Sequence, residues 1–378
     1  MRIGFLTTKI NFEGAGGSVP DLDCKVRLLR RAGHEVYVLT LFSEKNNYSD
    51  LPYPVYERRV KGTKSWFAVQ RHVFTTLRSY HQKADVFHVE FHFMYGAALY
   101  RLFGGKPVVV FYNREMVVWE GGSGFRALLR RIIEKFLCRT LGRVADQHYF
   151  TTPFLEKMYA DFGLRLRKEQ CAVIVDFFDP KEMRKGIIGA ERTGYIDKTV
   201  LFASGRHVEQ KGFHLLVEAV ALLPHALQRT IHVTIGGDGP ERERTIERAK
   251  DRGVFDIFSF PGWIEKEAFS RTLVTSDIFV LPRWRIEQPS VVVEEALSLG
   301  VPVVAPGGGG VEWMAGPAIA TFVDSDAQSL SRALAKLIGS REELTRLSAA
   351  ARERWEVLDP AVRIKDLEAI FQKAYGRV

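Results

Sequence analysis

The sequence predicts an α/β protein made of two domains, each built around a parallel sheet. The chain has 378 residues, which is more than a single hydrophobic core usually holds. Short apolar runs typical of buried strands alternate with longer segments of helical period, and this series begins afresh near Lys198. With 46% hydrophobic and 26% charged residues, the chain has the material for two packed cores and no long biased tract that would indicate disorder.

The first half opens as a strand, a helix and a second strand. The expected elements are, in order, a strand (2–7), a glycine-rich loop (11–18), a helix (21–32) and four further strands (35–40, 86–89, 107–111 and 148–151). Segments long enough for a crossover helix separate most of these strands, which predicts parallel pairing.

A basic segment over residues 125–142 also has helical period. Its apolar stripe consists of Leu128, Leu129, Ile132, Ile133, Phe136 and Leu137. Its cations are Arg126, Arg130, Arg131, Lys135, Arg139 and Arg143. A helix of this kind can lie on an anionic membrane, and the same stripe is typical of a helix that packs on a core. The sequence leaves both interpretations open.

The second half repeats the architecture. Its expected strands cover residues 200–203, 232–236, 257–260, 278–281 and 303–305. The boundary is expected between Phe178 and Tyr195, where charged residues and glycines replace the apolar periodicity. This gives an N-terminal domain over 1–182 and a C-terminal domain over 183–359. The pattern of the last segment, 360–378, allows either domain, and we expect its helix to pack back on the first.

The net charge of +9 lies entirely in the N-terminal half. Residues 1–180 contain 27 Lys and Arg against 18 Asp and Glu, whereas residues 181–378 contain 27 against 27. Such an excess suits an anionic partner such as phosphate-bearing lipid or a membrane surface, and an ordinary solvated basic surface is the alternative. A nucleic-acid partner is not expected, because the basic residues form no recognised binding module.

Neither secretion nor a cysteine-based site is indicated. No apolar run approaches the roughly 20 residues that a membrane span requires. The three cysteines, Cys24, Cys138 and Cys171, are widely spaced and include no C-x-x-C pair, which argues against a disulfide framework or a zinc site. We therefore expect a cytoplasmic protein.

Two segments of the second half predict a site for phosphate. Ligands of open parallel sheets bind beyond the carboxyl ends of the strands, and both segments follow a strand. The first brings two cations, Arg206 and Lys211, which can hold a diphosphate. The second is a glycine turn with Gly237 and Asp238 before a helix, where free N–H groups favour an anion or sugar hydroxyls. Tight turns also use glycines routinely, so this turn is a weak signal alone.

Two further segments predict contacts to the rest of a nucleotide-sugar. Trp263 follows a strand and could flank a nucleobase. Glu287 can accept hydrogen bonds from sugar hydroxyls, and a helix beginning near Ser290 and Val291 can present N–H groups to phosphate. Glu295, one turn into that helix, can take two vicinal ribose hydroxyls.

These motifs resemble the retaining glycosyltransferases of family GT4. The resemblance rests on R-x4-K, G-D-G-P and E-x7-E followed by A-L-x-x-G-x-P-V-V-A, in that order, and is densest from Leu201 to Glu312. It implies the GT-B fold, in which two Rossmann-like domains face each other across a cleft. It also implies transfer of a sugar from a nucleoside-diphosphate-sugar with retention of anomeric configuration.

The resemblance also implies a role for each position. Arg206 and Lys211 would neutralise the donor diphosphate, so that no metal or other cofactor is required. Glu287 would bind the donor sugar and act with these cations in catalysis, while Glu295 would bind ribose. Gly16 and Gly17 match the opening glycine loop of the family, which faces the donor phosphates.

The chain departs from the family pattern after the strand at 107–111. Many members have a histidine there that touches the donor sugar, whereas this chain has Tyr112 and Asn113. Asn113 could replace that hydrogen bond, and Glu90 or His92 could contact the acceptor or the sugar. His88, Glu90 and His92 could all line the mouth of the cleft if they share one face of a strand, although a metal site is disfavoured there.

The leading interpretation is an enzyme of bacterial envelope, polysaccharide or lipid-linked glycan synthesis, with an anionic or lipid-linked acceptor. We expect a cytoplasmic protein, with peripheral attachment to the inner face of the membrane as one alternative. Two alternatives stay open: a GT-B epimerase or phosphorylase, and a catalytically silent sugar-nucleotide-binding partner of another transferase. The E-x7-E pattern favours the transferase over the first alternative. The retained charges at 206, 211, 287 and 295 argue against the second.

Overall fold

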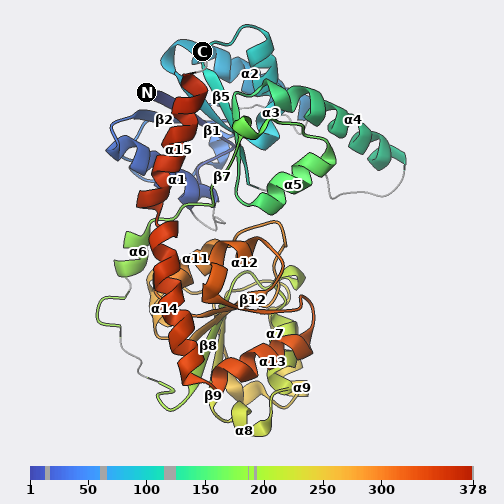
Figure 1. Cartoon of the computed structure of the whole chain (residues 1–378), viewed down its shortest axis with the longest axis vertical. Coiled ribbons are helices and arrows are strands. Elements are labelled where there is room, and N and C mark those ends of the chain that lie inside the picture. The colour runs from blue at the N-terminus through green and yellow to red at the C-terminus, as the bar shows by residue number, and fades with distance from the viewer. Residues whose placement is uncertain (13–17, 60–65, 115–124, 186, 191–193, 377–378) are drawn as a thin grey trace. The chain divides into compact units, whose positions relative to one another are not determined.

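The chain folds into two compact units. The computed structural model describes all residues except 13–17, 60–65, 115–124, 186, 191–193 and 377–378 (Figure 1). The first unit comprises Met1–Phe178 with Pro360–Val378, and the second comprises Asp179–Asp359. The named strands of both sheets pair in parallel, which confirms the predicted α/β class. The boundary falls slightly earlier than residue 182, and the last helix lies in the first unit.

The first unit contains a seven-stranded sheet in the order β3-β2-β1-β4-β5-β6-β7. Its strands are β1 (Arg2–Thr7), β2 (Glu35–Thr40), β3 (Val55–Glu57), β4 (Val86–Glu90), β5 (Val108–Asn113), β6 (Gln147–Phe150) and β7 (Cys171–Val173). The sequence patterns predicted the five inner strands and missed the two at the edges.

Helices cover both faces of this sheet. They are α1 (Ser18–Arg31), α2 (Trp66–Ser79), α3 (Met94–Leu102), α4 (Phe125–Leu141), α5 (Pro153–Phe162) and α15 (Pro360–Tyr375). On one face, Phe371 of α15 packs against Phe5 of β1, with 6.4 Å between the ring centroids. On the other face, Tyr159 of α5 lies 4.6 Å from Phe91, in a core that also includes residues of α2 and α3.

A buried ionic network ties α1 to the end of β5. Lys25 is fully buried, its Nζ lies 2.7 Å from Asp21 Oδ2, and it stands 3.9 Å from the centre of the Tyr112 ring. The hydroxyl of Tyr112 donates to Asp176, and Arg114 Nε donates to the other oxygen of that carboxylate at 2.9 Å. Burial opposes ionisation of Asp176, but the charges of Arg114 and Lys25 hold its pKa below the ordinary value.

The same network extends to the segment that leaves the first unit. Asp21 Oδ1 accepts the backbone N–H of Phe177 at 2.7 Å. Arg363 of α15 donates to the backbone carbonyls of Val175 at 2.9 Å and Asp176 at 2.8 Å. The last helix therefore fixes residues 175–177 by hydrogen bonds as well as by packing.

The second unit contains a six-stranded sheet in the order β10-β9-β8-β11-β12-β13. Its strands are β8 (Thr199–Ser204), β9 (Ile231–Gly236), β10 (Phe258–Gly262), β11 (Ile278–Val280), β12 (Val303–Pro306) and β13 (Ile319–Phe322). Its helices are α6 (Pro180–Lys185), α7 (Phe213–Ala221), α8 (His225–Gln228), α9 (Arg242–Asp251), α10 (Lys266–Val274), α11 (Val291–Ser298), α12 (Gly310–Ala315), α13 (Ala327–Ile338) and α14 (Arg341–Leu358). The strand order reverses between β8 and β11, and such a reversal marks the ligand-binding end of an open α/β sheet.

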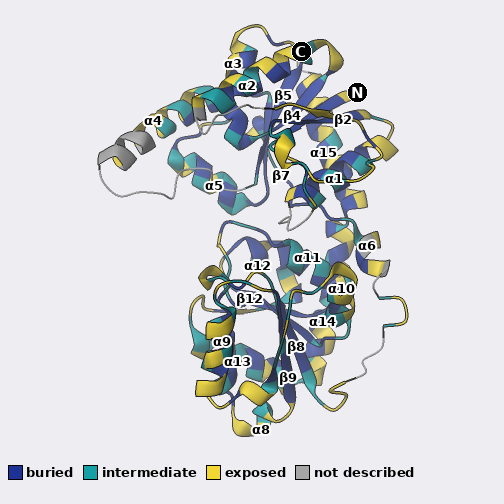
Figure 2. Cartoon of the chain, turned by 180° about the vertical axis from the view of Figure 1, so that it is seen from behind, coloured by how far each residue is buried: buried dark blue, intermediate teal, exposed yellow. Residues whose placement is uncertain are grey.

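Helix α4 leaves four side chains of its apolar stripe exposed. Exposed fractions are 57% for Leu128, 58% for Ile132, 49% for Ile133 and 64% for Phe136, and exposed residues are visible along this helix in Figure 2. The core-facing interpretation of the stripe is therefore wrong for these four side chains. Within the described ranges, no helix is both long enough and apolar enough to cross a bilayer.

Candidate functional site

Glycines bring three strand ends of the second unit into contact. Gly205, after β8, donates its N–H to the Gly236 carbonyl at 3.1 Å, and Gly237 donates to the Gly262 carbonyl at 2.6 Å. Gly237 has a φ of +112°, and a side chain there would lie only 2.0 Å from the Gly205 carbonyl oxygen. Only glycine fits this position, so the turn that contains Gly237 and Asp238 is held against the loop that carries Arg206.

The two predicted cations lie on that loop and its continuation. Arg206 is exposed, whereas Lys211 is partly buried. Burial, assisted by the charge of Arg206, lowers the pKa of Lys211 to about 8. The Nζ atom of Lys211 stands 3.7 Å from the centre of the Trp284 ring, a cation–π contact that fixes the direction of the ammonium group.

Trp284 links the loop after β8 to the loop after β11. Its indole N–H donates to the Pro289 carbonyl at 3.1 Å. The adjacent residue Arg283 packs against Gly212, where an added side chain would come within 2.7 Å of the arginine Cβ. The contact between Lys211 and Trp284 therefore joins the loops that follow β8 and β11, the two strands between which the strand order reverses. The Trp284 hydrogen bond to Pro289 ties this contact to the segment just before α11.

Glu287 is buried, with 5% exposure, and Arg285 Nε donates to its Oε1 at 2.6 Å. Arg285 supplies a third cation beside a predicted site residue, and the sequence motifs did not predict it. They did not predict Trp284 either. An aromatic and a basic residue directly after a strand and just before Glu287 were the available signal for both.

Helix α11 begins at Val291, with Ser290 as its N-cap, as the sequence predicted. The hydroxyl of Ser290 is buried and has no hydrogen-bond partner among the residues that the structure describes. A buried hydroxyl at a helix N-terminus, next to free backbone N–H groups, can accept or donate to a bound phosphate.

Glu295 lies one turn further along α11. Burial raises the pKa of its carboxyl to about 7, against the opposing charge of Lys266 at the start of α10. Trp263, which follows β10, is 67% exposed and donates its indole N–H to Glu265 at 3.1 Å.

In the first unit, predicted residues also lie at carboxyl ends of strands. Glu90 ends β4, accepts the Thr7 hydroxyl at 2.8 Å, and lies 3.4 Å from His92 Nδ1. Asn113 ends β5, is fully buried and donates to the Tyr149 carbonyl at 3.0 Å, while its own Oδ1 has no hydrogen-bond partner within the described ranges. Gly16 and Gly17 lie outside the described residues.

The prediction that His88, Glu90 and His92 share one face is wrong. His88 is 3% exposed, and its ring stacks on Phe5 with 4.3 Å between the centroids. Strand β4 ends at Glu90, so His92 lies on a turn of 3-10 helix that no longer alternates like a strand. Among the side chains that the structure describes, no group of three His, Cys, Asp or Glu has the arrangement of a metal site.

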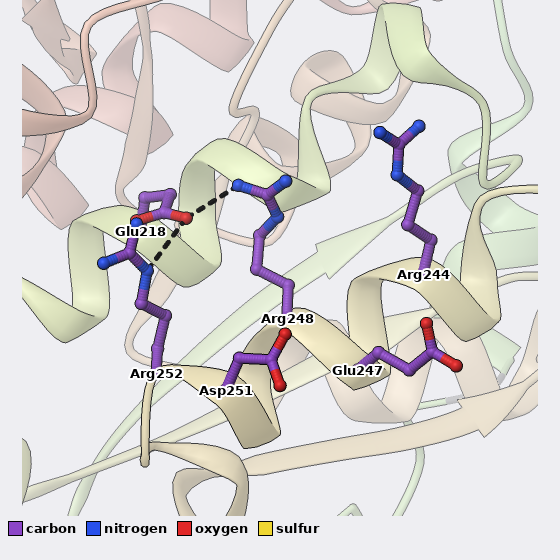
Figure 3. Close-up of a pocket in the computed structure, with 6 residues that line it drawn as sticks. All are labelled: Glu218, Arg244, Glu247, Arg248, Asp251 and Arg252. Atoms are coloured by element: carbon purple, nitrogen blue, oxygen red, sulfur yellow. Dashed lines mark hydrogen bonds and ion pairs between the residues drawn. The ribbon is translucent and has the colours of Figure 1, made fainter.

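A charged pocket lies elsewhere on the second unit, between α7 and α9 (Figure 3). Glu218 reaches from α7 to Arg248 at 2.7 Å and to Arg252 at 2.8 Å. The remaining lining residues are Arg244, Glu247 and Asp251. None of the predicted donor-binding residues lines this pocket, and its charges largely compensate one another.

The chain matches two protein-family models, which together cover most of its length. "Glycosyltransferase Family 4" matches residues 25–182 and "Glycosyl transferases group 1" matches residues 191–354. The lipopolysaccharide core biosynthesis glycosyltransferase LpsE of Rhizobium meliloti (strain 1021) is 33% identical over 159 residues, which is 42% of this chain and 44% of that relative. The chain thus matches less than half of that relative's length.

Another relative and a solved structure extend over more of the chain. A GDP-mannose-dependent phosphatidylinositol monomannoside mannosyltransferase of Mycolicibacterium smegmatis (strain ATCC 700084 / mc(2)155) is 27% identical over 71% of this chain and 72% of its own. The structure of HepE from Anabaena in complex with UDP covers 98% of both chains with a TM-score of 0.76 and 16% identity, which supports the fold alone. The sheet topology, the ordered motifs and the two family matches together identify the chain as a GT4-type glycosyltransferase with the GT-B fold.

Proposed function

We propose that this glycosyltransferase moves a sugar from a nucleoside-diphosphate-sugar to an anionic or lipid-linked glycan acceptor, with retention of anomeric configuration. The main support is the pair of cations, Arg206 and Lys211, on the loop after β8, where the strand order of the sheet reverses. Lys211 is held there against Trp284, which is hydrogen-bonded to the segment before α11. The fixed charge of Lys211, together with the exposed Arg206 on the same loop, suits a diphosphate. UDP in the fold neighbour HepE is in keeping with this assignment.

Each residue has one part in the proposed reaction. Arg206 and Lys211 stabilise the charge that develops on the departing diphosphate, so the transfer proceeds without a metal ion. Glu287, oriented by Arg285, accepts hydroxyls of the donor sugar, and Glu295 accepts the ribose hydroxyls. Asn113, Glu90 and His92 contact the sugar or the acceptor from the first unit.

The positive charge of the first half and the activities named for two relatives support an anionic or lipid-linked acceptor. The excess of positive charge in the first 180 residues favours an anionic acceptor. The named relatives act in lipopolysaccharide core biosynthesis and on a phosphatidylinositol monomannoside. We place the chain in bacterial envelope glycan synthesis, at the inner face of the membrane.

Thermal unfolding with a panel of nucleoside diphosphates and their sugars tests the donor site. One nucleotide is expected to raise the melting temperature, because ligands that bind only the native state stabilise it. Lys211→Ala and Glu295→Ala should abolish the shift. Lys250→Ala and Glu247→Ala, which change exposed residues of α9, should keep it. A shift lost in Glu247→Ala but kept in Lys211→Ala would move the nucleotide to the pocket of Figure 3.

Nucleotide affinity is expected to fall as the pH drops through about 7. Burial raises the pKa of Glu295 to about 7, so its carboxyl is neutral below that pH and can no longer accept two ribose hydroxyls. Calorimetric Kd values between pH 6 and 8 measure this effect. Glu295→Gln should bind weakly at every pH, and an unchanged pH profile in that variant would remove Glu295 from the ribose site.

One measurement tests retention of the anomeric configuration, and a second tests whether the reaction needs a metal ion. The anomeric configuration of the new glycosidic bond, read by NMR, should match that of the donor sugar. The initial rate should be unchanged by a chelator such as EDTA. Inverted product, or a rate that EDTA abolishes and added Mg²⁺ restores, would contradict the corresponding part of the proposal.

A further inference from the structure

Helix α4 carries an apolar surface that the first unit leaves uncovered. Leu128, Ile132 and Phe136 recur every fourth residue, so they form one ridge along the helix, and each is more than half exposed. The side that faces the unit holds Cys138, which is 2% exposed. At these described positions a small side chain faces inward and large apolar side chains face outward, whereas an ordinary surface helix turns its large apolar side chains inward.

Cations border this apolar ridge. A pocket of about 340 Å³ beside α4 is lined by Ile132, Lys135, Phe136, Arg139, Gly163 and Arg165. Lys135, Arg139 and Arg165 are exposed, and no carboxylate of the described part of the chain pairs with Lys135 or Arg139. The pocket therefore combines an apolar wall with three cationic side chains.

The position of this surface is fixed by the fold. Arg143 Nε, just beyond α4, donates to the Arg165 carbonyl at 3.1 Å, which ties the end of the helix to the segment after α5. Lys135 packs its stem beside Gly163, where an added side chain would come within 3.2 Å of the lysine Cγ. The cations and the apolar ridge therefore belong to one surface of the first unit.

An anionic bilayer matches this combination of chemistry. Apolar side chains bury in the region between headgroups and acyl chains, and neighbouring Lys and Arg reach the phosphates at the depth of the headgroups. The whole net charge of +9 belongs to the first 180 residues, which include α4, so the field of this unit attracts an anionic surface. A protein partner of the same face would have to supply both an apolar groove and several carboxylates.

We propose that α4 docks this chain on anionic membranes, with Leu128, Ile132 and Phe136 inserted into the interface and Lys135, Arg139 and Arg165 on lipid phosphate. This inference rests on the proposed function only in placing the acceptor at a membrane, and it is independent of the donor nucleotide. The docking is peripheral and reversible, because one amphipathic helix supplies it.

Flotation with lipid vesicles tests the proposal. The full chain is expected to float with vesicles of phosphatidylcholine and phosphatidylglycerol at low salt, and less so as salt rises. Phosphatidylcholine alone should bind at least tenfold more weakly. Failure to float with the anionic vesicles at low salt, or equal binding to neutral ones, would overturn the proposal.

Paired variants separate the two components of the surface. Ile132→Ser/Phe136→Ser should reduce vesicle binding at least tenfold at all salt concentrations. Lys135→Ala/Arg139→Ala should reduce it about 25-fold at low salt, since each cation near an anionic surface contributes about fivefold, and should reduce the salt dependence. All four positions are exposed, so melting temperatures should stay close to that of the unmodified chain.

Matched controls come from the second unit. Leu222→Ser/Val357→Ser and Arg229→Ala/Arg332→Ala make the same chemical changes at exposed positions and should float like the unmodified chain. If the control pairs lose binding as strongly as the α4 pairs, the attraction is a general property of the protein and α4 is not the docking element.

Two further measurements keep this proposal apart from the donor site and from self-association. Nucleotide-induced stabilisation should be equal in the unmodified chain and the α4 variants, so loss of flotation with the nucleotide shift intact affects only the docking proposal. In sedimentation without vesicles, a concentration-dependent dimer that Phe136→Ser abolishes would assign the surface to a second copy of the chain and overturn membrane docking.

Discussion

Replacing Lys211 with methionine is expected to lower kcat/KM for sugar transfer by about 100- to 1,000-fold, the usual effect of removing one preorganised charge from a developing anion. Methionine keeps much of the apolar contact with Trp284 but loses the ammonium group. The effect should fall mainly on kcat, because the diphosphate gains charge as the glycosidic bond breaks. Initial rates with saturating acceptor measure it.

The pH dependence of the unmodified enzyme adds a second test of Lys211. Since its pKa is lowered to about 8, the ammonium group is present below that pH and is lost above it, so kcat/KM should decline as the pH rises through about 8. Lys211→Arg should remove this alkaline limb, because a guanidinium stays protonated. With the ionisation of Glu295 near 7, the optimum should be narrow and lie between the two values.

Lys250→Met is the matched control for Lys211→Met, since Lys250 is an exposed lysine of α9. Its kcat/KM should equal that of the unmodified enzyme. A Lys211→Met variant that retains more than a third of the activity would show that the diphosphate leaves without help from this lysine.

The second large effect is expected on stability. Lys25→Met should lower the free energy of unfolding of the first unit by about 3–5 kcal/mol, the cost of leaving one partner of a buried ion pair uncompensated. Asp21 would keep its Phe177 N–H bond but lose the ammonium group that lies 2.7 Å from its carboxylate. Tyr112 would lose the charge that lies over its ring. Urea unfolding followed by tyrosine and tryptophan fluorescence measures the change.

A double variant separates charge from shape at this site. Lys25→Met/Asp21→Asn removes both charges and should recover part of the loss, because no buried charge of the pair remains unmatched. Lys157→Met, at an exposed position of α5, should leave stability unchanged. A loss below about 1 kcal/mol in Lys25→Met would mean that water reaches this pair in solution and solvates Asp21.

The sequence predicted the inner strands of both sheets because most of them lie in apolar runs bounded by turn residues. It missed β3, β7 and β13, which lie at the sheet edges. Strand β3 has three residues, none of them buried, and follows Pro54, so neither apolar alternation nor length marked it. Edge strands gain part of their order from the neighbouring strand, and that contribution has no local signature.

Side-chain direction limited the prediction of the site. The positions of Arg206, Lys211, Glu287 and Glu295 after their strands followed from the motif order. The contact of Lys211 with Trp284 and that of Glu287 with Arg285 did not. Both depend on how a loop of ten residues folds back after β11. The network around Lys25 was also missed, because its members lie far apart in sequence and each is ordinary by itself.

Helix α4 shows a related limit. An apolar stripe at helical spacing identifies which side chains share a face, but it contains no information on what that face contacts. The tertiary position of the helix rules out the core-facing interpretation for Leu128, Ile132, Ile133 and Phe136, which are exposed.

The last helix has a consequence for the order in which the chain acquires its structure during synthesis. The second unit is continuous in sequence, whereas the core of the first unit includes Leu367 and Phe371 of α15. Arg363, also in α15, holds residues 175–177, where the chain leaves the first unit. On the ribosome, the earlier half of the chain therefore waits for α15 (Pro360–Tyr375), while the later half can already close its core. The part made first is the part finished last, and until then its apolar sheet face is open to chaperones and to other unfinished chains.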